Sequence, residues 1–241
     1  MISRNKLKWT LLALPLLASS ISSAMADSLA GPSGELIVTG VYKPEACFVT
    51  LANNGTVDYG RMPAATLNAT DYTTLPIKTL TNAITINCPN TTSVGITTQD
   101  NRAATAIYGD NVYDPARKLP ISNTFGMPLG LGVDSASNKI GNYISQLQNL
   151  KYDGSEGYFG SFATTPFAPT QVAGLKPTLN VGVPSNGGLI NNLYDSSGAI
   201  LNAKLYTMDY SVSAQVAPIA NLNLSRDIVL DGSVTISLYY L

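Results

Sequence analysis

The clearest alternation of hydrophobic and polar positions in the chain lies at its carboxyl end. Every second side chain there is apolar or aromatic and those between are mostly polar; the apolar set is Val234, Ile236, Leu238 and Tyr240. A period of two in β-branched and aromatic residues predicts a strand with one buried face. Because this strand runs to Leu241, we expect its outer edge to be paired within the protein or offered to a partner.

Similar patterns predict further strands. Residues 206–216 alternate over eleven positions, and 227–240 are expected to return beside them as an antiparallel partner. Shorter strands are predicted at 35–42, 47–51, 56–59, 83–88 and 93–98, with a turn at 53–55, and the Gly-rich stretch 125–133 predicts a strand in close backbone contact. Residues 61–76, 153–170 and 184–200 are predicted loops, the first with one irregular helical turn.

One segment, residues 139–148, is ambiguous. Its apolar residues have helical spacing, but its β-branched content and Gly141 favour a strand equally, so both alternatives stay open. Taken together, the elements predict an all-β protein, a single antiparallel β-sandwich with an elaborated, loop-rich middle between about residues 100 and 200. With no evident domain boundary, we expect residues 27–241 to form one domain.

The first 26 residues have the features of a secretory signal peptide. A basic start is followed by a short apolar run and a small-x-small cleavage site, with the key residues Arg4, Lys6, Lys8, Ala24 and Ala26. The apolar run is too short to span a bilayer, so a retained N-terminal anchor is the weaker alternative. We therefore expect a mature chain that begins near Asp27, has no membrane span, and resides in the periplasm or at the surface of a Gram-negative bacterium.

Charge and cysteine content narrow the class of protein. Without residues 1–26 the chain keeps 11 basic and 15 acidic side chains, a net charge of about −4, which provides no basic surface for nucleic acid. Two cysteines, Cys47 and Cys88, follow the predicted leader, and in an oxidising compartment such a pair is expected to form a disulfide. The alternative is a pair of free buried thiols.

The chain lacks the residues that most catalytic mechanisms require. The chain contains no histidine, which removes Ser-His-Asp and Cys-His catalysis and most zinc sites, and it has no Gly-rich phosphate-binding loop. We therefore predict a non-enzymatic protein without cofactor or metal. Asp153 and Glu156 are the carboxylate pair considered for glycoside hydrolysis, but they are more typical of a solvated turn. A cluster of aromatic residues, Tyr158, Phe159, Phe162 and Phe167, predicts a loop that packs on the sandwich or, less often, one that contacts a glycan.

Several segments carry a resemblance to known families. The opening segment Gly34-Glu-Leu-Ile-Val-Thr-Gly-Val-Tyr-Lys-Pro-Glu-Ala-Cys47, the strand Ile84-Thr-Ile-Asn-Cys88 and the alternating C-terminal strand resemble the structural subunits of chaperone–usher fimbriae. A resemblance over nearly the whole mature chain is to the GltF-like family of bacterial periplasmic proteins, whose function is unassigned. Its motifs here are Glu35-Leu-Ile-Val-Thr-Gly40, Val57-Asp-Tyr-Gly60, Gln99-Asp-Asn-Arg102, Lys139-Ile-Gly141 and residues 230–241.

The pilin resemblance implies an Ig-like sandwich that lacks one strand. The last strand would then line an open groove, filled first by a periplasmic chaperone and later by the N-terminal extension of another subunit, with an usher as a further partner. The implied groove residues are Gly232, Val234, Ile236, Leu238, Tyr240 and the Leu241 carboxylate. Residues 27–34 make a poor donor extension, which departs from the pilin pattern. The alternative is a closed sandwich, a soluble periplasmic ligand- or glycan-binding protein.

Overall fold

The computed structural model describes residues 37–41, 46–107, 113–114, 119–120, 128–160, 174–181 and 190–241. The chain divides into two compact units, residues 1–42 and 43–241. In the first unit, residues 37–41 form no helix or strand, and the side chains of Ile37, Val38 and Val41 are 73%, 98% and 93% exposed. The strand predicted at 35–42 is therefore wrong over these five residues, because none of the described strands pairs with them.

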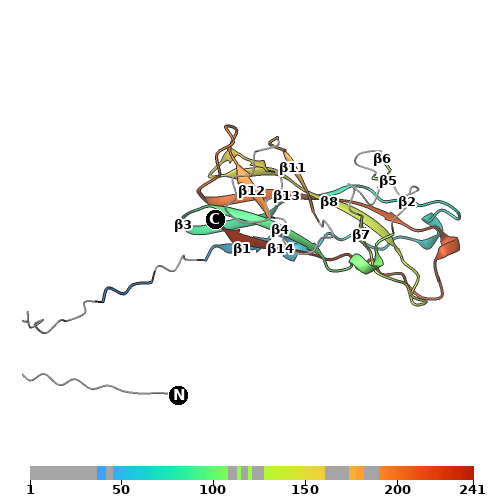
Figure 1. Cartoon of the computed structure of the whole chain (residues 1–241). Coiled ribbons are helices and arrows are strands. Elements are labelled where there is room, and N and C mark those ends of the chain that lie inside the picture. The colour runs from blue at the N-terminus through green and yellow to red at the C-terminus, as the bar shows by residue number, and fades with distance from the viewer. Residues whose placement is uncertain are drawn as a thin grey trace, which may run out of the picture. The chain divides into compact units, whose positions relative to one another are not determined.

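Residues 43–241 contain two antiparallel sheets that pack face to face (Figure 1). The larger sheet has the order β1 (Phe48–Leu51), β3 (Lys78–Thr92), β13 (Ala203–Val216), β8 (Gly141–Tyr152) and β11 (Thr178–Val181), with short strands β2 (Thr73–Thr74), β7 (Leu129–Gly130) and β9 (Ser155–Glu156) at its sides. The smaller sheet has the order β10 (Tyr158–Phe159), β12 (Asn191–Tyr194), β4 (Val94–Asp100) and β14 (Val234–Tyr240).

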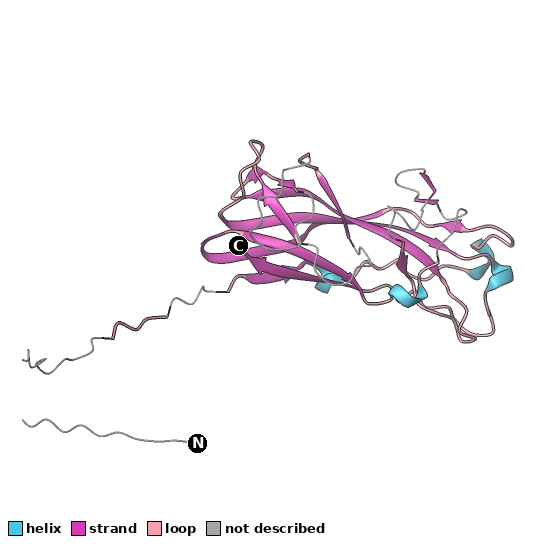
Figure 2. Ribbon diagram, viewed as in Figure 1, coloured by secondary structure: helices cyan, strands magenta, loops and turns pink. Residues whose placement is uncertain are grey.

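The remaining elements are short. β5 (Tyr113–Asp114) pairs with β6 (Leu119–Pro120), and four 3₁₀ turns lie at η1 (Ala52–Gly55), η2 (Ala64–Thr66), η3 (Ala103–Thr105) and η4 (Ile219–Asn221). Strands and loops make up nearly all of the described chain (Figure 2). The predicted all-β antiparallel sandwich is therefore confirmed.

Buried apolar side chains from both sheets form the core. Ile86 and Leu147 of the larger sheet and Ile96 and Leu193 of the smaller one are fully buried in one cluster. A second cluster lies between β7, β8 and β13 and the segment 222–234, where Leu129, Ile140 and Val216 are buried. The alternation within each strand directs these residues to one face, as expected for a sandwich.

The chain changes sheets between β3 and β4, which are separated by Ser93 alone. The strands predicted at 83–88 and 93–98 both exist, but they lie in different sheets and do not pair with each other. The predicted pairing of 206–216 with the terminal strand is also wrong. β13 pairs with β3 and β8, whereas β14 pairs with β4. Alternation identifies the buried face of a strand but not its neighbour, which explains both outcomes.

Several local predictions also change. The ambiguous segment 139–148 is a strand, since most of it lies in β8. Residues 56–59 form no strand, and the terminal strand begins at Val234 rather than at residue 227. The predicted loops 153–170 and 184–200 contain β9, β10 and β12. Short strands can form in segments of low β-propensity when neighbouring strands pair with them. The helical turn predicted in 61–76 is η2.

Candidate strand-binding groove

The terminal strand β14 has one paired edge and one open edge. All of its residues pair with β4, from Val234 opposite Asp100 to Tyr240 opposite Val94. The pairing continues at the carboxyl end, where the Leu241 N–H donates to the Ser93 carbonyl at 3.0 Å. Within the described residues, no strand pairs with the other edge of β14. That edge therefore presents unpaired main-chain groups, which is the requirement for strand addition.

The apolar face of β14 turns toward the interior. Val234, Ile236 and Leu238 are partly buried and pack on the main core cluster, whereas Thr235 and Ser237 between them are exposed. This is the face assignment that the alternation predicts. The three side chains form one wall of a cavity.

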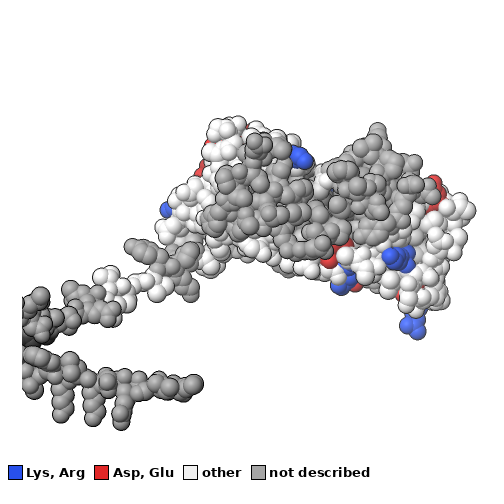
Figure 3. All heavy atoms as spheres, viewed as in Figure 1, with Lys and Arg blue, Asp and Glu red and all other residues white. Residues whose placement is uncertain are grey.

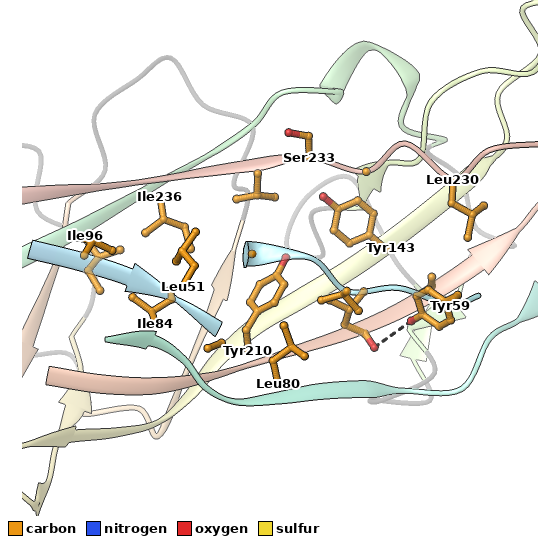
Figure 4. Close-up of a pocket in the computed structure, with 18 of the residues that line it drawn as sticks. Leu51, Tyr59, Leu80, Ile84, Ile96, Tyr143, Tyr210, Leu230, Ser233 and Ile236 are labelled. Carbon is orange, nitrogen blue, oxygen red and sulfur yellow. Dashed lines mark hydrogen bonds between the residues drawn. The ribbon is translucent and has the colours of Figure 1, made fainter. Parts of the chain in front are cut away.

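The cavity is an elongated apolar groove of about 350 Å³ between the open edges of the two sheets. Val49 and Leu51 of β1 form the opposite wall, and their side chains are 50% and 46% exposed. Figure 4 shows Leu51 facing Ile236 across the space, above a floor that includes Leu80 and Ile84 of β3. Like β14, β1 pairs with a single strand among the described residues, which is β3. The groove thus separates two unpaired strand edges.

Tyrosines interrupt the apolar lining near the middle of the groove. The hydroxyl ends of Tyr210 and Tyr143 point toward this middle, with Ile236 and Leu51 to one side and Leu230 to the other (Figure 4). Burial raises the pKa of Tyr210 to about 12 and that of Tyr143 further, so both phenols stay protonated at neutral pH. Tyr59, at the far side, donates its hydroxyl to the Val212 carbonyl at 3.4 Å. The groove therefore has two apolar ends and a hydroxyl-bearing centre.

The groove is closed at the end that lies beside the disulfide. Cys47 and Cys88 form the predicted bond, with 4.2 Å between their Cα atoms, and so attach the start of β1 to β3. The Cys47 N–H donates to the Tyr240 hydroxyl at 2.8 Å, which links β1 to β14 across the groove. We call this the disulfide end.

The β14 wall of the groove is held in position near the start of the strand. Arg102 binds Asp231 in a two-pronged ion pair, with distances of 2.7 Å from Nε and 3.1 Å from Nη2, and this contact lowers the pKa of the Asp231 carboxyl. Asn101 donates its side-chain amide to the Ser233 and Thr235 hydroxyls. These contacts hold residues 231–235 in place, so the groove does not depend on a bound partner to position this wall.

The predicted groove residues separate into two sets. Gly232, Val234, Ile236 and Leu238 line the groove. Tyr240 and Leu241 do not: Tyr240 closes the disulfide end, and Leu241 extends the ladder to Ser93. A Cβ at Gly232 would lie 2.7 Å from the Tyr143 ring, so the glycine leaves room for that side chain. The leader residues Ala24 and Ala26 lie outside the described part of the chain.

Sequence reasoning missed the opposite wall and the floor. Val49 and Leu51 were placed in a strand but not in the groove, and Tyr143 and Tyr210 were placed only within the segments 139–148 and 206–216. The signal available in β1 is that Val49 and Leu51 fall on one face of a strand, so this apolar face is expected to pack against another part of the protein. The tyrosines carry no such signal, because their position depends on the packing of β8 and β13.

A second cavity of about 750 Å³ lies between residues 57–67 and 224–230, and it shares Val57, Tyr59 and Leu230 with the groove. Its apolar lining includes Leu67, Leu75 and Val216, and its charged residues are of both signs: Asp58, Arg61, Arg226 and Asp227. The second cavity is therefore adjacent to the groove.

The other candidate residues occupy structural positions. Phe159 is 1% exposed in the core, and neither it nor Tyr158 lines the groove or the second cavity; Phe162 and Phe167 lie outside the described residues. Asp153 accepts the Leu205 N–H at 2.9 Å and so shapes a turn, and Glu156 is exposed. The described residues hold no cluster of three or more metal-binding side chains. On the face shown in Figure 3, charged side chains are sparse and of both signs.

Comparison with known proteins agrees with the resemblance in the sequence. Residues 36–144 match the family described as "Protein of unknown function (DUF1120)". Protein GltF of Escherichia coli (strain K12) is 26% identical over 247 residues, which cover 93% of this chain and 94% of that protein. Both matches support a GltF-like family of unassigned function for this chain.

The family match spans both β1 and β4, and the alignment to GltF covers most of the chain. The disulfide, together with the similarity to GltF, indicates an extracellular or periplasmic protein. In the described residues, no helix has the length and hydrophobicity needed to cross a bilayer.

Proposed function

We propose that this chain is an exported, non-enzymatic protein of the fimbrial type that binds an extended strand through its apolar groove. The partner would be a periplasmic chaperone or a neighbouring subunit, in the periplasm or at the cell surface of a Gram-negative bacterium. The observation that carries the proposal is the open edge of β14 beside a preformed apolar groove.

Elementary energetics support strand addition at this place. An incoming strand would satisfy main-chain groups along β14 and at the same time cover apolar side chains on both walls. Burying a Val or Leu side chain completely contributes about 1.5–3 kcal/mol, and Val49 and Leu51 are still about half exposed. The occupant therefore gains both directional hydrogen bonds and apolar contact, a combination that a small polar ligand would not obtain.

The non-enzymatic part of the proposal rests on composition. The sequence holds no histidine, and both of its cysteines are in the disulfide. One carboxylate considered for catalysis, Asp153, accepts hydrogen bonds from the backbone N–H groups of Lys204 and Leu205 at the start of β13.

Capture by a periplasmic chaperone tests the proposal. The full chain would be co-expressed for export with a tagged fimbrial chaperone, and the co-purified fraction measured. Ile236→Asp places a charge in the groove and should reduce capture at least tenfold. Ser237→Asp, the adjacent residue on the exposed face, is the matched control and should leave capture unchanged. Circular dichroism and disulfide content of both variants establish that they fold.

Two results would count against the proposal. Equal capture of the Ile236→Asp and Ser237→Asp variants would remove the groove from the interaction. A chain that is never captured, although stable and folded, would favour the alternative of a soluble periplasmic ligand-binding protein.

A further inference from the structure

Asp209 is a buried carboxylate on β13, the central strand of the larger sheet. It is 8% exposed, and among the described residues it has no cationic partner, because the one salt bridge found there joins Arg102 to Asp231. Burial of a carboxylate is costly unless its oxygens accept good hydrogen bonds. Both oxygens of Asp209 do so: Oδ1 accepts the Asn82 N–H of β3, and Oδ2 accepts the side-chain amide of Asn149 in β8, each at 2.7 Å.

The strands on both sides of β13 are irregular at this position. The register shifts on the β3 side just after Met208 and on the β8 side just before Asp209. Asn82 and Asn149 have φ angles of 48° and 53°, in the left-handed region that residues other than glycine rarely adopt. Asp209 therefore holds together two bulges, one in each neighbouring strand.

These bulges affect which side chains reach the groove. Ala83 and Ile84 are consecutive in β3, yet both are buried and both line the groove, which the alternation of a regular strand does not allow. Tyr210 directly follows Asp209 and pairs with Leu80 at the first position after the bulge in β3. Both of these side chains lie in the groove (Figure 4). The floor of the groove and the place of its central phenol therefore depend on the bulges.

The contacts also explain why an acidic side chain stands here. A carboxylate accepts hydrogen bonds at both oxygens, and Asp209 meets a donor on each side of β13. Alanine would offer neither acceptor. Asparagine would still accept the Asn82 N–H and would donate to Asn149 once the amide of Asn149 turns over, so it is the conservative replacement.

We propose that Asp209 is a positioning residue of the groove. Its carboxylate fixes the bulges of β3 and β8 and so holds Tyr210 and the floor in the shape that a bound strand requires. The role in binding rests on the proposed function, whereas the hold on the bulges is a property of the free protein. The two parts can therefore be measured separately.

Ser211 supplies a matched control. It lies two residues further along β13, on the same face as Asp209. Its hydroxyl also contacts both neighbouring strands, at 2.7 Å from the Thr79 hydroxyl of β3 and 3.0 Å from the Gln148 amide of β8. No register shift occurs at Ser211. Loss of this hydroxyl removes contacts to the same two strands without touching a bulge.

Amide hydrogen exchange and chaperone capture of the full chain test the proposal. Asp209→Ala should accelerate exchange of the Asn82 N–H at least tenfold and reduce capture at least fivefold, and Asp209→Asn should restore most of both. Ser211→Ala should lower the melting temperature but leave capture and Asn82 exchange unchanged. Asn149→Gly removes one contact and keeps a positive φ accessible, so it should fold even where Asp209→Ala does not, and should reduce capture at least threefold.

Each contrary outcome has a distinct meaning. Slow Asn82 exchange in Asp209→Ala would show that the carboxylate does not hold the bulge. Fast exchange with undiminished capture would overturn the role in the groove and leave the proposed function standing. Equal loss of capture in Asp209→Ala and Ser211→Ala would reduce Asp209 to a general stabilising residue. A wild type that is never captured overturns the proposed function and with it the role in strand binding, while the exchange result still decides whether Asp209 holds the bulges.

Discussion

At the scale of single residues, a small number of side chains hold the two walls of the groove apart at a fixed distance. Tyr240 joins β14 to the start of β1 at the disulfide end, and the ion pair of Arg102 with Asp231 fixes the segment that leads into β14. Neither contact is deeply buried. Their effect is therefore on the geometry of the groove more than on total stability, because exposed ion pairs contribute about 0–1 kcal/mol.

The Tyr240 contact gives a direct prediction. Tyr240→Phe removes the acceptor of the Cys47 N–H and should lower the free energy of unfolding by about 0.5–1.5 kcal/mol, the usual contribution of one hydrogen bond. Urea denaturation measures the change. Tyr239→Phe, the adjacent ring on the other face of β14, is the control. Equal effects of the two substitutions would show that the hydrogen bond has no role in stability.

Asp134 gives a prediction about pH. Burial tends to raise the pKa of its carboxyl, but hydrogen bonds from Asn223, Asn138 and Ala136 outweigh this and lower it from 3.8 to about 2. The stabilisation by the ionised form is therefore complete above pH 3.8 and is lost as the pH falls through about 2. Asp134→Asn should be less stable than the wild type at pH 7, and the difference should shrink between pH 4 and pH 2. Urea denaturation across this range measures it, and a difference that is constant with pH would contradict the assignment.

At the scale of elements, the groove exists because two strands end their sheets without a neighbour. β14 is long and fully paired to β4 on its other side, so it is a stable edge. β1 has only four residues, all with exposed side chains, and its pairing to β3 is reinforced by the disulfide at its start. The stability of the groove therefore depends most on its weaker wall, β1.

Removing the disulfide should release this weaker wall. Closing a loop over the separation of 41 residues stabilises a protein by about 4 kcal/mol in the loop-entropy model, so the double variant Cys47→Ser, Cys88→Ser should lose up to that amount. Amide hydrogen exchange should increase first in Phe48–Leu51 and remain slow in β13. Uniform acceleration of exchange across both strands would show instead that β1 unfolds only together with the whole sandwich.

At the scale of the whole molecule, the sandwich is complete except along the groove. Its main core is fully buried, whereas apolar side chains of β1 and β14 reach solvent along the groove between them. A folded protein that exposes an apolar groove differs from a partly unfolded one, because its remaining tertiary contacts stay rigid.

An apolar dye should therefore bind the native protein. Fluorescence of anilinonaphthalene sulfonate at neutral pH should rise in the presence of the folded chain and should fall severalfold with Ile236→Asp but not with Ser237→Asp. A near-ultraviolet dichroism spectrum recorded on the same samples shows that tertiary structure is retained. Dye fluorescence that is unaffected by Ile236→Asp would place the exposed apolar surface elsewhere.

Much of the fold follows from periodicity in the sequence. The faces of β14 and β13 and the strand at 83–88 could be predicted, because alternation requires only that one side of each strand be buried. The disulfide also followed, since two cysteines after an apparent leader leave few alternatives.

The partners of these strands could not be predicted in the same way. Sheet order depends on long-range packing, and Pro89 and Gly95, which flank Ser93, indicate a break in the chain but not that β3 and β4 enter different sheets. The open edge beside Ile236 likewise depends on which of the described strands pair with β14. The groove wall formed by Val49 and Leu51 could not be predicted either, because it also depends on long-range packing.

The disulfide also determines how the sandwich carries tension. A pull applied through the residues before Cys47 passes to Cys88 in β3, the strand next to the edge strand β1, because a covalent bond joins the two cysteines. β3 is held there on both sides, by β1 and by β13, so the load is shared as shear across many hydrogen bonds. The short strand β1 is bypassed and keeps its shape, and the groove beside it stays intact while the molecule is stretched.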